Sequence, residues 1–125
     1  MYAPRILIVD DDEQILRLFR RILEEVGYSV TAVGSSYKAL IELRDNSFEI
    51  MVTDLSMPDL DGLELMKTAR RECPHIKILV VSGFMGGAML DLAKALGAQA
   101  TLDKLLAPEL LLPIVCKMLE WGESA

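Results

Sequence analysis

The stretch Arg5-Ile-Leu-Ile-Val-Asp-Asp-Asp12 contains the pattern that decides the fold. Its first five residues, Arg5 to Val9, are a continuous β-branched and apolar run, which is typical of a strand buried on both faces. Three aspartates follow at once, and apolar residues then recur at helical spacing with one buried stripe. That stripe comprises Ile15, Leu18, Phe19, Ile22, Leu23 and Val26. The sequence therefore predicts a buried strand that passes directly into an amphipathic helix.

Cap residues support this first helix. Asp11, with Gln14 three residues later, resembles a capping box at the start. Gly27 provides a stop signal at the end, because glycine readily adopts the left-handed backbone that closes many helices.

The same alternation of strand and helix repeats about five times along the chain. The predicted strands are Arg5–Val9, Tyr28–Val33, Phe48–Thr53, Lys77–Ser82 and Ala98–Leu102. The later helices are expected from Gly34-Ser35-Ser36 to Leu43 (inward Ala39, Leu40, Leu43), over Leu63–Arg71 (inward Leu63, Met66, Ala69), over Ala88–Leu96, and from about Pro108 to Trp121. Such alternation predicts an α/β fold, a doubly wound parallel sheet with helices on both faces. With 125 residues and no linker, residues 1–125 are expected to form a single domain.

Composition and charge exclude several classes of protein. The formal net charge of −6 argues against direct nucleic acid binding, which needs a positive patch. The two cysteines, Cys73 and Cys116, are too few for a disulfide framework and are expected to be reduced thiols. The lone His75 has no neighbour at metal-ligand spacing and is expected at the surface. No signal peptide pattern or membrane span is visible, so we expect no membrane association and a cytoplasmic location.

Polar residues stand at the ends of the predicted strands. The first strand ends in Asp10 and Asp11, the third in Asp54, the fourth in Ser82, and the fifth near Lys104. In open parallel sheets, ligands bind beyond the carboxyl ends of the strands, so these side chains are expected to share one crevice if the first and third strands are neighbours.

That set of residues suits phosphoryl transfer to an aspartate. Clustered carboxylates repel one another unless a cation lies among them, and Mg²⁺ with oxygen ligands fits best. A carboxylate can act as the nucleophile, while a metal ion and a lysine neutralise charge on the transferring group. Each residue alone has a plain alternative: Asp10 to Asp12 as an acidic helix start, Asp54 as a turn residue, Lys104 as a surface charge. Their complementary types at different strand ends favour the site.

The chain resembles the receiver domains of bacterial two-component response regulators. The matching pieces are Ile-Leu-Ile-Val-Asp10-Asp11, Thr53-Asp54-Leu-Ser-Met-Pro58-Asp-Leu-Asp-Gly62, Val-Val-Ser82-Gly83 and the Lys104 position. The resemblance covers essentially the whole chain. It implies a flavodoxin-like (βα)5 fold with strand order 2-1-3-4-5.

The resemblance also implies a role for each residue of the set. Asp54 would accept phosphate from a histidine kinase or a histidine phosphotransfer protein. Asp10 and Asp11 would hold Mg²⁺ together with Asp54 and the backbone carbonyl of Ser56. Ser82 and Lys104 would contact the phosphoryl group and pull their loops toward it, which is a two-state switch. Such a receiver assists only its own phosphorylation and dephosphorylation and is not an enzyme acting on external substrates.

Three positions depart from the family pattern. Leu105 replaces the usual proline after the lysine, so no cis peptide is expected there. Thr101 occupies the position of the aromatic switch residue, so the usual coupled rotation of serine and aromatic ring is not available. Pro113 falls inside the last predicted helix and should kink that helix or delay its start.

The surface formed by the fourth helix, fifth strand and fifth helix is the family's usual docking face. Met85, Met89, Leu105 and Leu106 are expected to leave it apolar, although each could instead pack inward. The sequence therefore predicts self-association or binding of a partner helix through this face.

Two other functions remain open from the sequence. A haloacid-dehalogenase-like phosphohydrolase would use an aspartate nucleophile in a similar sheet, but it needs an acid at the position of Ser56. A receiver-like interaction domain that works without phosphorylation is compatible with Thr101 and Leu105. The complete set of Asp10, Asp11, Asp54, Ser82 and Lys104 favours the phosphorylated receiver over both.

Overall fold

A five-stranded parallel sheet forms the centre of the molecule in the computed structural model, which describes residues 3–55, 62–83 and 87–121, with side chains omitted for 87–90. The strands are β1 (Arg5–Val9), β2 (Ser29–Val33), β3 (Ile50–Thr53), β4 (Lys77–Ser82) and β5 (Ala100–Asp103). Their order is β2-β1-β3-β4-β5, and every neighbouring pair is parallel. The predicted fold class and strand order are therefore confirmed.

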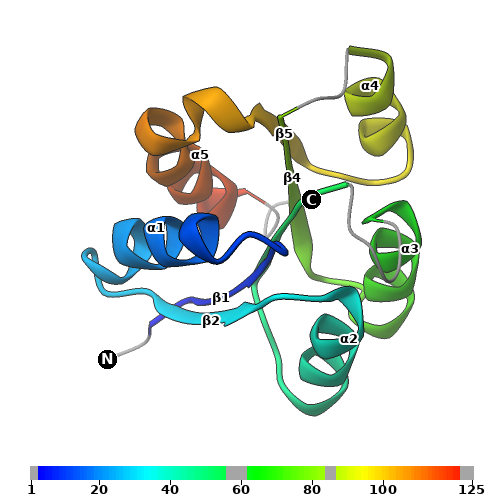
Figure 1. The fold of residues 1–125 in the computed structure, drawn as a ribbon. Helices are drawn as coiled ribbons and strands as arrows, with labels where there is room; N and C mark the ends of the chain where they lie inside the picture. The colour runs from blue at the N-terminus through cyan, green and yellow to red at the C-terminus, as the bar shows by residue number, and fades with distance from the viewer. Residues whose placement is uncertain (1–2, 56–61, 84–86, 122–125) are drawn as a thin grey trace.

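Helices cover both faces of this sheet (Figure 1). The helices α1 (Glu13–Glu24) and α5 (Ala107–Glu120) lie on one face. On the other face lie α2 (Ser36–Asp45), α3 (Gly62–Glu72) and α4 (Gly87–Ala95). Within the described part of the chain, no helix has the length and apolar character that crossing a membrane requires.

Alternating side chains of each strand supply the two halves of the core. Ile6 and Ile8 of β1 pack with Phe19, Leu23 and the buried side of α5. Leu7 and Val9 of the same strand pack on the opposite face with α2 and α3. A strand buried on both faces has an unbroken apolar run in its interior, which is why β1 and β4 begin and end where the sequence predicts.

The start of α1 differs from the prediction. The N-cap is Asp12, not Asp11, because Asp12 has an extended backbone and its side chain accepts from the backbone N–H groups of Gln14 and Ile15. The helix ends at Glu24, before the left-handed Gly27 (φ 94°), so Val26 lies in the turn and is 49% exposed. The prediction that Val26 belongs to the buried stripe is wrong.

The boundaries of β5 also differ from the prediction. Ala98, predicted as its first residue, instead closes α4: its N–H donates to the carbonyl of Ala93, next to the left-handed Gly97. The strand proper begins at Ala100. Arg70 of α3 reaches across and donates to the carbonyls of Ile76 and Gly97, which ties α3 to the loops that flank β4 and β5.

Pro113 lies within a continuous α5. The helix begins at Ala107, with Pro108 in its first turn, so Pro113 does not delay its start and that alternative is wrong. Pro113 is exposed, while Leu111 and Val115 are buried. The backbone hydrogen bond that proline removes is therefore lost on the solvent side, where water can replace it.

Candidate functional site

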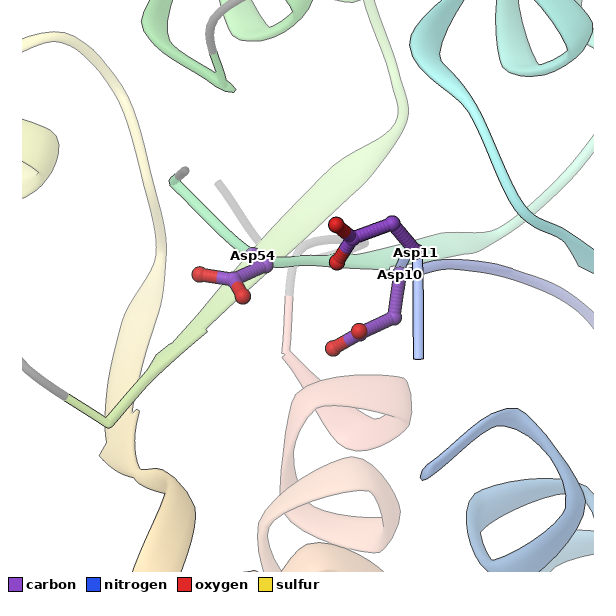
Figure 2. A group of neighbouring side chains, drawn as sticks. All are labelled: Asp10, Asp11 and Asp54. Atoms are coloured by element: carbon purple, nitrogen blue, oxygen red, sulfur yellow. The ribbon is translucent and has the colours of Figure 1, made fainter. Parts of the chain in front are cut away.

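The carboxyl edge of the sheet brings together acidic residues from two neighbouring strands. Asp10 follows β1 and Asp54 follows β3, and the N–H of Asp54 donates to the carbonyl of Val9, 3.3 Å away. Carboxylate oxygens of Asp10, Asp11 and Asp54 all lie within 4.8 Å of one another. Figure 2 shows the side chains of Asp10 and Asp11 extending toward the side on which Asp54 lies. The parallel pairing of β1 and β3 is what creates this cluster.

The cluster is largely shielded from solvent. Asp10 is 3% exposed and Asp54 is 9% exposed, whereas Asp11 is exposed. The backbone N–H of Asp12 donates to Oδ1 of Asp10 at 2.9 Å, which fixes the orientation of that carboxylate. Asp12 thus caps α1 while Asp10 and Asp11 remain directed to the site.

Lys104 bridges the two buried carboxylates. Its Nζ lies 2.9 Å from Oδ2 of Asp10 and 2.9 Å from Oδ2 of Asp54. Its side chain is 22% exposed, so these charge-assisted bonds are only partly screened by water. The structure therefore joins residues from the ends of β1, β3 and β5 through one ammonium group.

The pKa values of this group respond to burial and to the ion pairs. Burial raises the pKa of Asp10, even though the hydrogen bonds from Lys104 and from the Asp12 backbone act to lower it. Burial alone would lower the pKa of Lys104, but its hydrogen bonds to Asp10 and Asp54 outweigh that effect and raise it. Lys104 therefore remains charged at neutral pH and partly compensates the acidic cluster.

The donor set fits a hard divalent cation. Three carboxylates within 4.8 Å offer several oxygen ligands, and Mg²⁺ typically takes one or two carboxylates and keeps some waters. Asp11 is exposed, which leaves an open side for water or for a phosphoryl oxygen. Ser56, predicted to contribute its carbonyl, lies outside the described residues.

Ser82 and Thr101 occupy the strands beside the cluster. Ser82 is the last residue of β4, is 5% exposed, and pairs with Asp103. Thr101 is half-buried in β5, opposite Val80. Both therefore lie where the sequence predicted.

The turn after Lys104 has a form that the sequence did not reveal. Lys104–Leu106 form a short 3₁₀ turn, and the Asp103 side chain accepts from the N–H of Leu105 at 2.9 Å. No cis peptide bond occurs in the part of the chain that the structure describes. Leu105 is 83% exposed and Leu106 is 49% exposed, whereas the side chains of Met85 and Met89 lie outside the described residues.

Gly62 is a supporting residue that the sequence analysis quoted as the last residue of a motif and gave no role of its own. A Cβ at this position would lie 2.5 Å from the carbonyl oxygen of Asp54 and 2.5 Å from Cα of Leu55. The N–H of Gly62 also donates to the carbonyl of Leu55 at 2.9 Å. The first residue of α3 therefore packs directly on the backbone that carries Asp54, and a glycine at a helix start was the one available signal.

Comparisons with known proteins agree with this fold and site. Residues 6–115 match the family model described as the response regulator receiver domain. The response regulator receiver protein CpdR of Brucella abortus is 35% identical over 85 residues, which are 68% of this chain and 71% of that protein. The alginate biosynthesis transcriptional regulatory protein AlgB of Pseudomonas putida is 33% identical over 117 residues, 93% of this chain but 26% of that protein.

A solved structure shows the same fold over nearly the whole length. The receiver domain protein from Methanospirillum hungatei, described as CheY-like, superimposes with a TM-score of 0.92 and 31% identity, and the match covers 98% of each chain. The fold and the site define a receiver of phosphorelay signalling. The chain belongs to the response regulator receiver domain family. It is thus a signalling module of two-component systems, and the phosphorylation-independent alternative is not favoured.

Proposed function

We propose that Asp54 is the residue that accepts the phosphoryl group. The observation that carries this proposal is the position of its carboxylate, buried at the end of β3, close to two other carboxylates and 2.9 Å from the ammonium of Lys104. An ionised carboxylate needs no general base. Its oxygen attacks phosphorus while the P–N bond of a phosphohistidine donor breaks and the electron pair returns to the imidazole nitrogen.

The other residues of the site orient and neutralise the transferring group. Asp10, Asp11 and Asp54, with the carbonyl of Ser56, would hold Mg²⁺, which when bound supplies positive charge to the phosphoryl oxygens. Lys104 and the hydroxyl of Ser82 would contact those oxygens. The same groups would support slow hydrolysis of the acyl phosphate, so the domain assists its own phosphorylation and dephosphorylation and acts on no external substrate.

The partners follow from this chemistry. The donor would be a histidine kinase or a histidine phosphotransfer protein. We place the receiver, as one unit over residues 1–125, in the cytoplasm and without direct contact to nucleic acid, in keeping with its net charge of −6.

Output would pass through the face made by α4, β5 and α5. The exposed side chains of Leu105, Leu106 and Leu110 support an apolar docking surface there for a second copy or a partner helix. Sedimentation velocity over a wide concentration range, with and without phosphorylation, tests self-association. A constant monomer mass in every condition, with no partner found, would contradict it.

The phosphorylation test uses acetyl phosphate with Mg²⁺ and intact mass spectrometry. Wild type should gain the mass of one phosphoryl group, and the gain should disappear in EDTA. Asp54→Asn should gain none, whereas Asp91→Asn, which alters an exposed acid of α4, should behave as wild type. A wild type that stays unmodified with acetyl phosphate and with phosphohistidine donors would instead support a phosphorylation-independent interaction domain.

A further inference from the structure

A pocket lies at the amino edge of the sheet, opposite the edge that carries the acidic cluster. It has a volume of about 500 Å³ and is lined by residues that include Phe48, Leu119 and Glu49. This volume is within the range of small-molecule sites. The amino ends of β1 and β4 border it through Arg5 and Lys77, so the sheet separates it from the acidic cluster.

Only one of the two carboxylate oxygens of Glu49 accepts a hydrogen bond from the protein. Its Oε1 accepts from the backbone N–H of Arg5 at 3.1 Å, which satisfies the first donor of β1. Its Oε2 is buried, and it is the one buried side-chain nitrogen or oxygen among the described residues without a hydrogen-bond partner. A buried carboxylate oxygen without a donor is costly, because an ionised oxygen has lost its water and gained nothing in exchange.

The two cationic side chains that line the pocket, Lys77 and Arg5, do not bind Glu49 Oε2. The ammonium of Lys77 donates to the carbonyls of Met118 and Trp121, at 2.7 and 2.8 Å, at the end of α5. The guanidinium of Arg5 lies over the ring of Phe48, 5.1 Å from its centre. Within the described part of the chain, neither cation forms an ion pair with Glu49, and the Arg5 guanidinium donates no hydrogen bond.

The pocket therefore combines three complementary features. Glu49 Oε2 lacks a donor, the Arg5 guanidinium offers donors without acceptors, and Phe48 and Leu119 add apolar lining. His75 also lines the pocket and adds a further polar group. A simple cation would satisfy Glu49 but would be repelled by Arg5 and Lys77, and a simple anion would leave Glu49 unsatisfied.

We propose that this amino-edge pocket binds a small zwitterion of the α-amino-acid class. On binding, the Glu49 carboxylate rotates to bring Oε2 to the pocket surface, where the ligand's ammonium donates to it. The ligand's carboxylate accepts from the Arg5 guanidinium, and its apolar side chain packs on Phe48 and Leu119. Charge-assisted hydrogen bonds at both ends supply orientation, and the apolar contact supplies the remaining affinity. This site is independent of the phosphorylation proposed for Asp54.

The test is a titration followed by ¹H–¹⁵N correlation spectra of the full chain. The probes are L-leucine, isopentylamine, which lacks the carboxylate, and 4-methylpentanoate, which lacks the ammonium. Leucine should give saturable shifts at residues 5, 47–49, 75–77 and 119, and it should bind more tightly than either partial probe. Asp54→Asn should bind leucine as wild type does.

Glu49→Gln is the decisive variant. The amide keeps an oxygen for the Arg5 N–H but turns the second position into a donor, so leucine and isopentylamine should bind about tenfold or more weakly. Glu109→Gln, an exposed glutamate of α5, is the matched control and should change nothing. Arg5→Met should weaken leucine binding, whereas isopentylamine, which Arg5 repels, should bind at least as tightly as in wild type; this keeps the test decisive even if Glu49→Gln unfolds.

Two results would overturn the proposal. One is the absence of saturable chemical-shift changes at the pocket with leucine, which would mean that a water molecule donates to Glu49 Oε2. The other is unchanged leucine affinity in folded Glu49→Gln together with unchanged affinity in Arg5→Met.

Discussion

Lys104→Met tests the electrostatic account of the acidic cluster most directly. The substitution keeps most of the apolar stem but removes the ammonium that lies 2.9 Å from both Asp10 and Asp54. The two carboxylates then face each other within 4.8 Å, where two unit charges repel by roughly 3.5 kcal/mol at an effective dielectric constant of about 20. Removing one partner of a buried ion pair costs about 3–5 kcal/mol.

The expected loss for this variant is smaller than that upper range. The Lys104 side chain keeps 22% of its accessible surface, and protonation of one carboxyl relieves part of the repulsion, so we expect a loss of about 2–3 kcal/mol in EDTA at pH 7. Urea unfolding followed by circular dichroism measures it. Lys94→Met, at an exposed position of α4, is the matched control and should unfold as wild type does.

Addition of Mg²⁺ makes the prediction sharper. A ligand at a hundred times its dissociation constant stabilises the folded state by about 2.7 kcal/mol. Since Lys104 and a bound cation share the same carboxylates, the gain from Mg²⁺ should be larger in Lys104→Met than in wild type. The reasoning is refuted if Lys104→Met matches wild type in EDTA, or if Mg²⁺ stabilises both proteins equally.

Three further changes probe the surroundings of the site and the sheet. Burial raises the pKa of Asp10 above 3.8, so the folded state binds that proton more tightly than the unfolded chain does. The free energy of unfolding of wild type in EDTA should therefore fall as the pH rises from 3.8 through the folded-state pKa. Asp10→Asn should lack this fall when both proteins are unfolded with urea at a series of pH values. Gly62→Ala should cost about 1–3 kcal/mol and slow phosphorylation by acetyl phosphate, since its Cβ would overlap backbone, whereas Gly34→Ala, whose Cβ would meet one atom at 3.9 Å, should be tolerated. Arg70→Ala removes three hydrogen bonds from a charged donor, to the carbonyls of Pro74, Ile76 and Gly97, and should cost at least about 2 kcal/mol in thermal or urea unfolding, unlike Arg71→Ala at an exposed position.

The sequence was sufficient for the strands whose residues are apolar without interruption. Arg5–Val9 and Lys77–Ser82 have the same bounds in the structure, because burial on both faces requires the apolar runs Ile6–Val9 and Ile78–Val81 and polar residues stand next to them. Ala98 was misassigned for the opposite reason. It is apolar, but its backbone N–H is used to close α4, and no side-chain pattern reports which carbonyl a backbone donor selects.

The site was predictable as a set of residues but not as a geometry. Strand ends of a parallel sheet must meet at one edge, which brought Asp10 and Asp54 together on the sequence alone. Three consecutive aspartates cannot be told apart by residue type. Only the backbone angles of the structure show that Asp12 caps α1 and that Asp11 is left for the site. Lys104 lies fifty residues after Asp54 in the chain. Its equally close contacts with Asp10 and Asp54 depend on where the sheet places β5, which no local sequence pattern specifies.

The turn after Lys104 explains why leucine rather than proline matters in this chain. The N–H of Leu105 donates to Asp103 Oδ1, a bond that proline could not form because it has no N–H. The capped turn leads directly into α5 and displays Leu105 with 83% of its surface exposed. With Thr101 too small to act as a rotating ring, Lys104 is the residue that links the acidic cluster to this apolar turn: its ammonium forms ion pairs with Asp10 and Asp54, and its backbone continues into Leu105. We therefore expect a change in what the Lys104 ammonium contacts to be transmitted along the backbone to Leu105, so that phosphorylation would alter the proposed docking surface without an aromatic side chain.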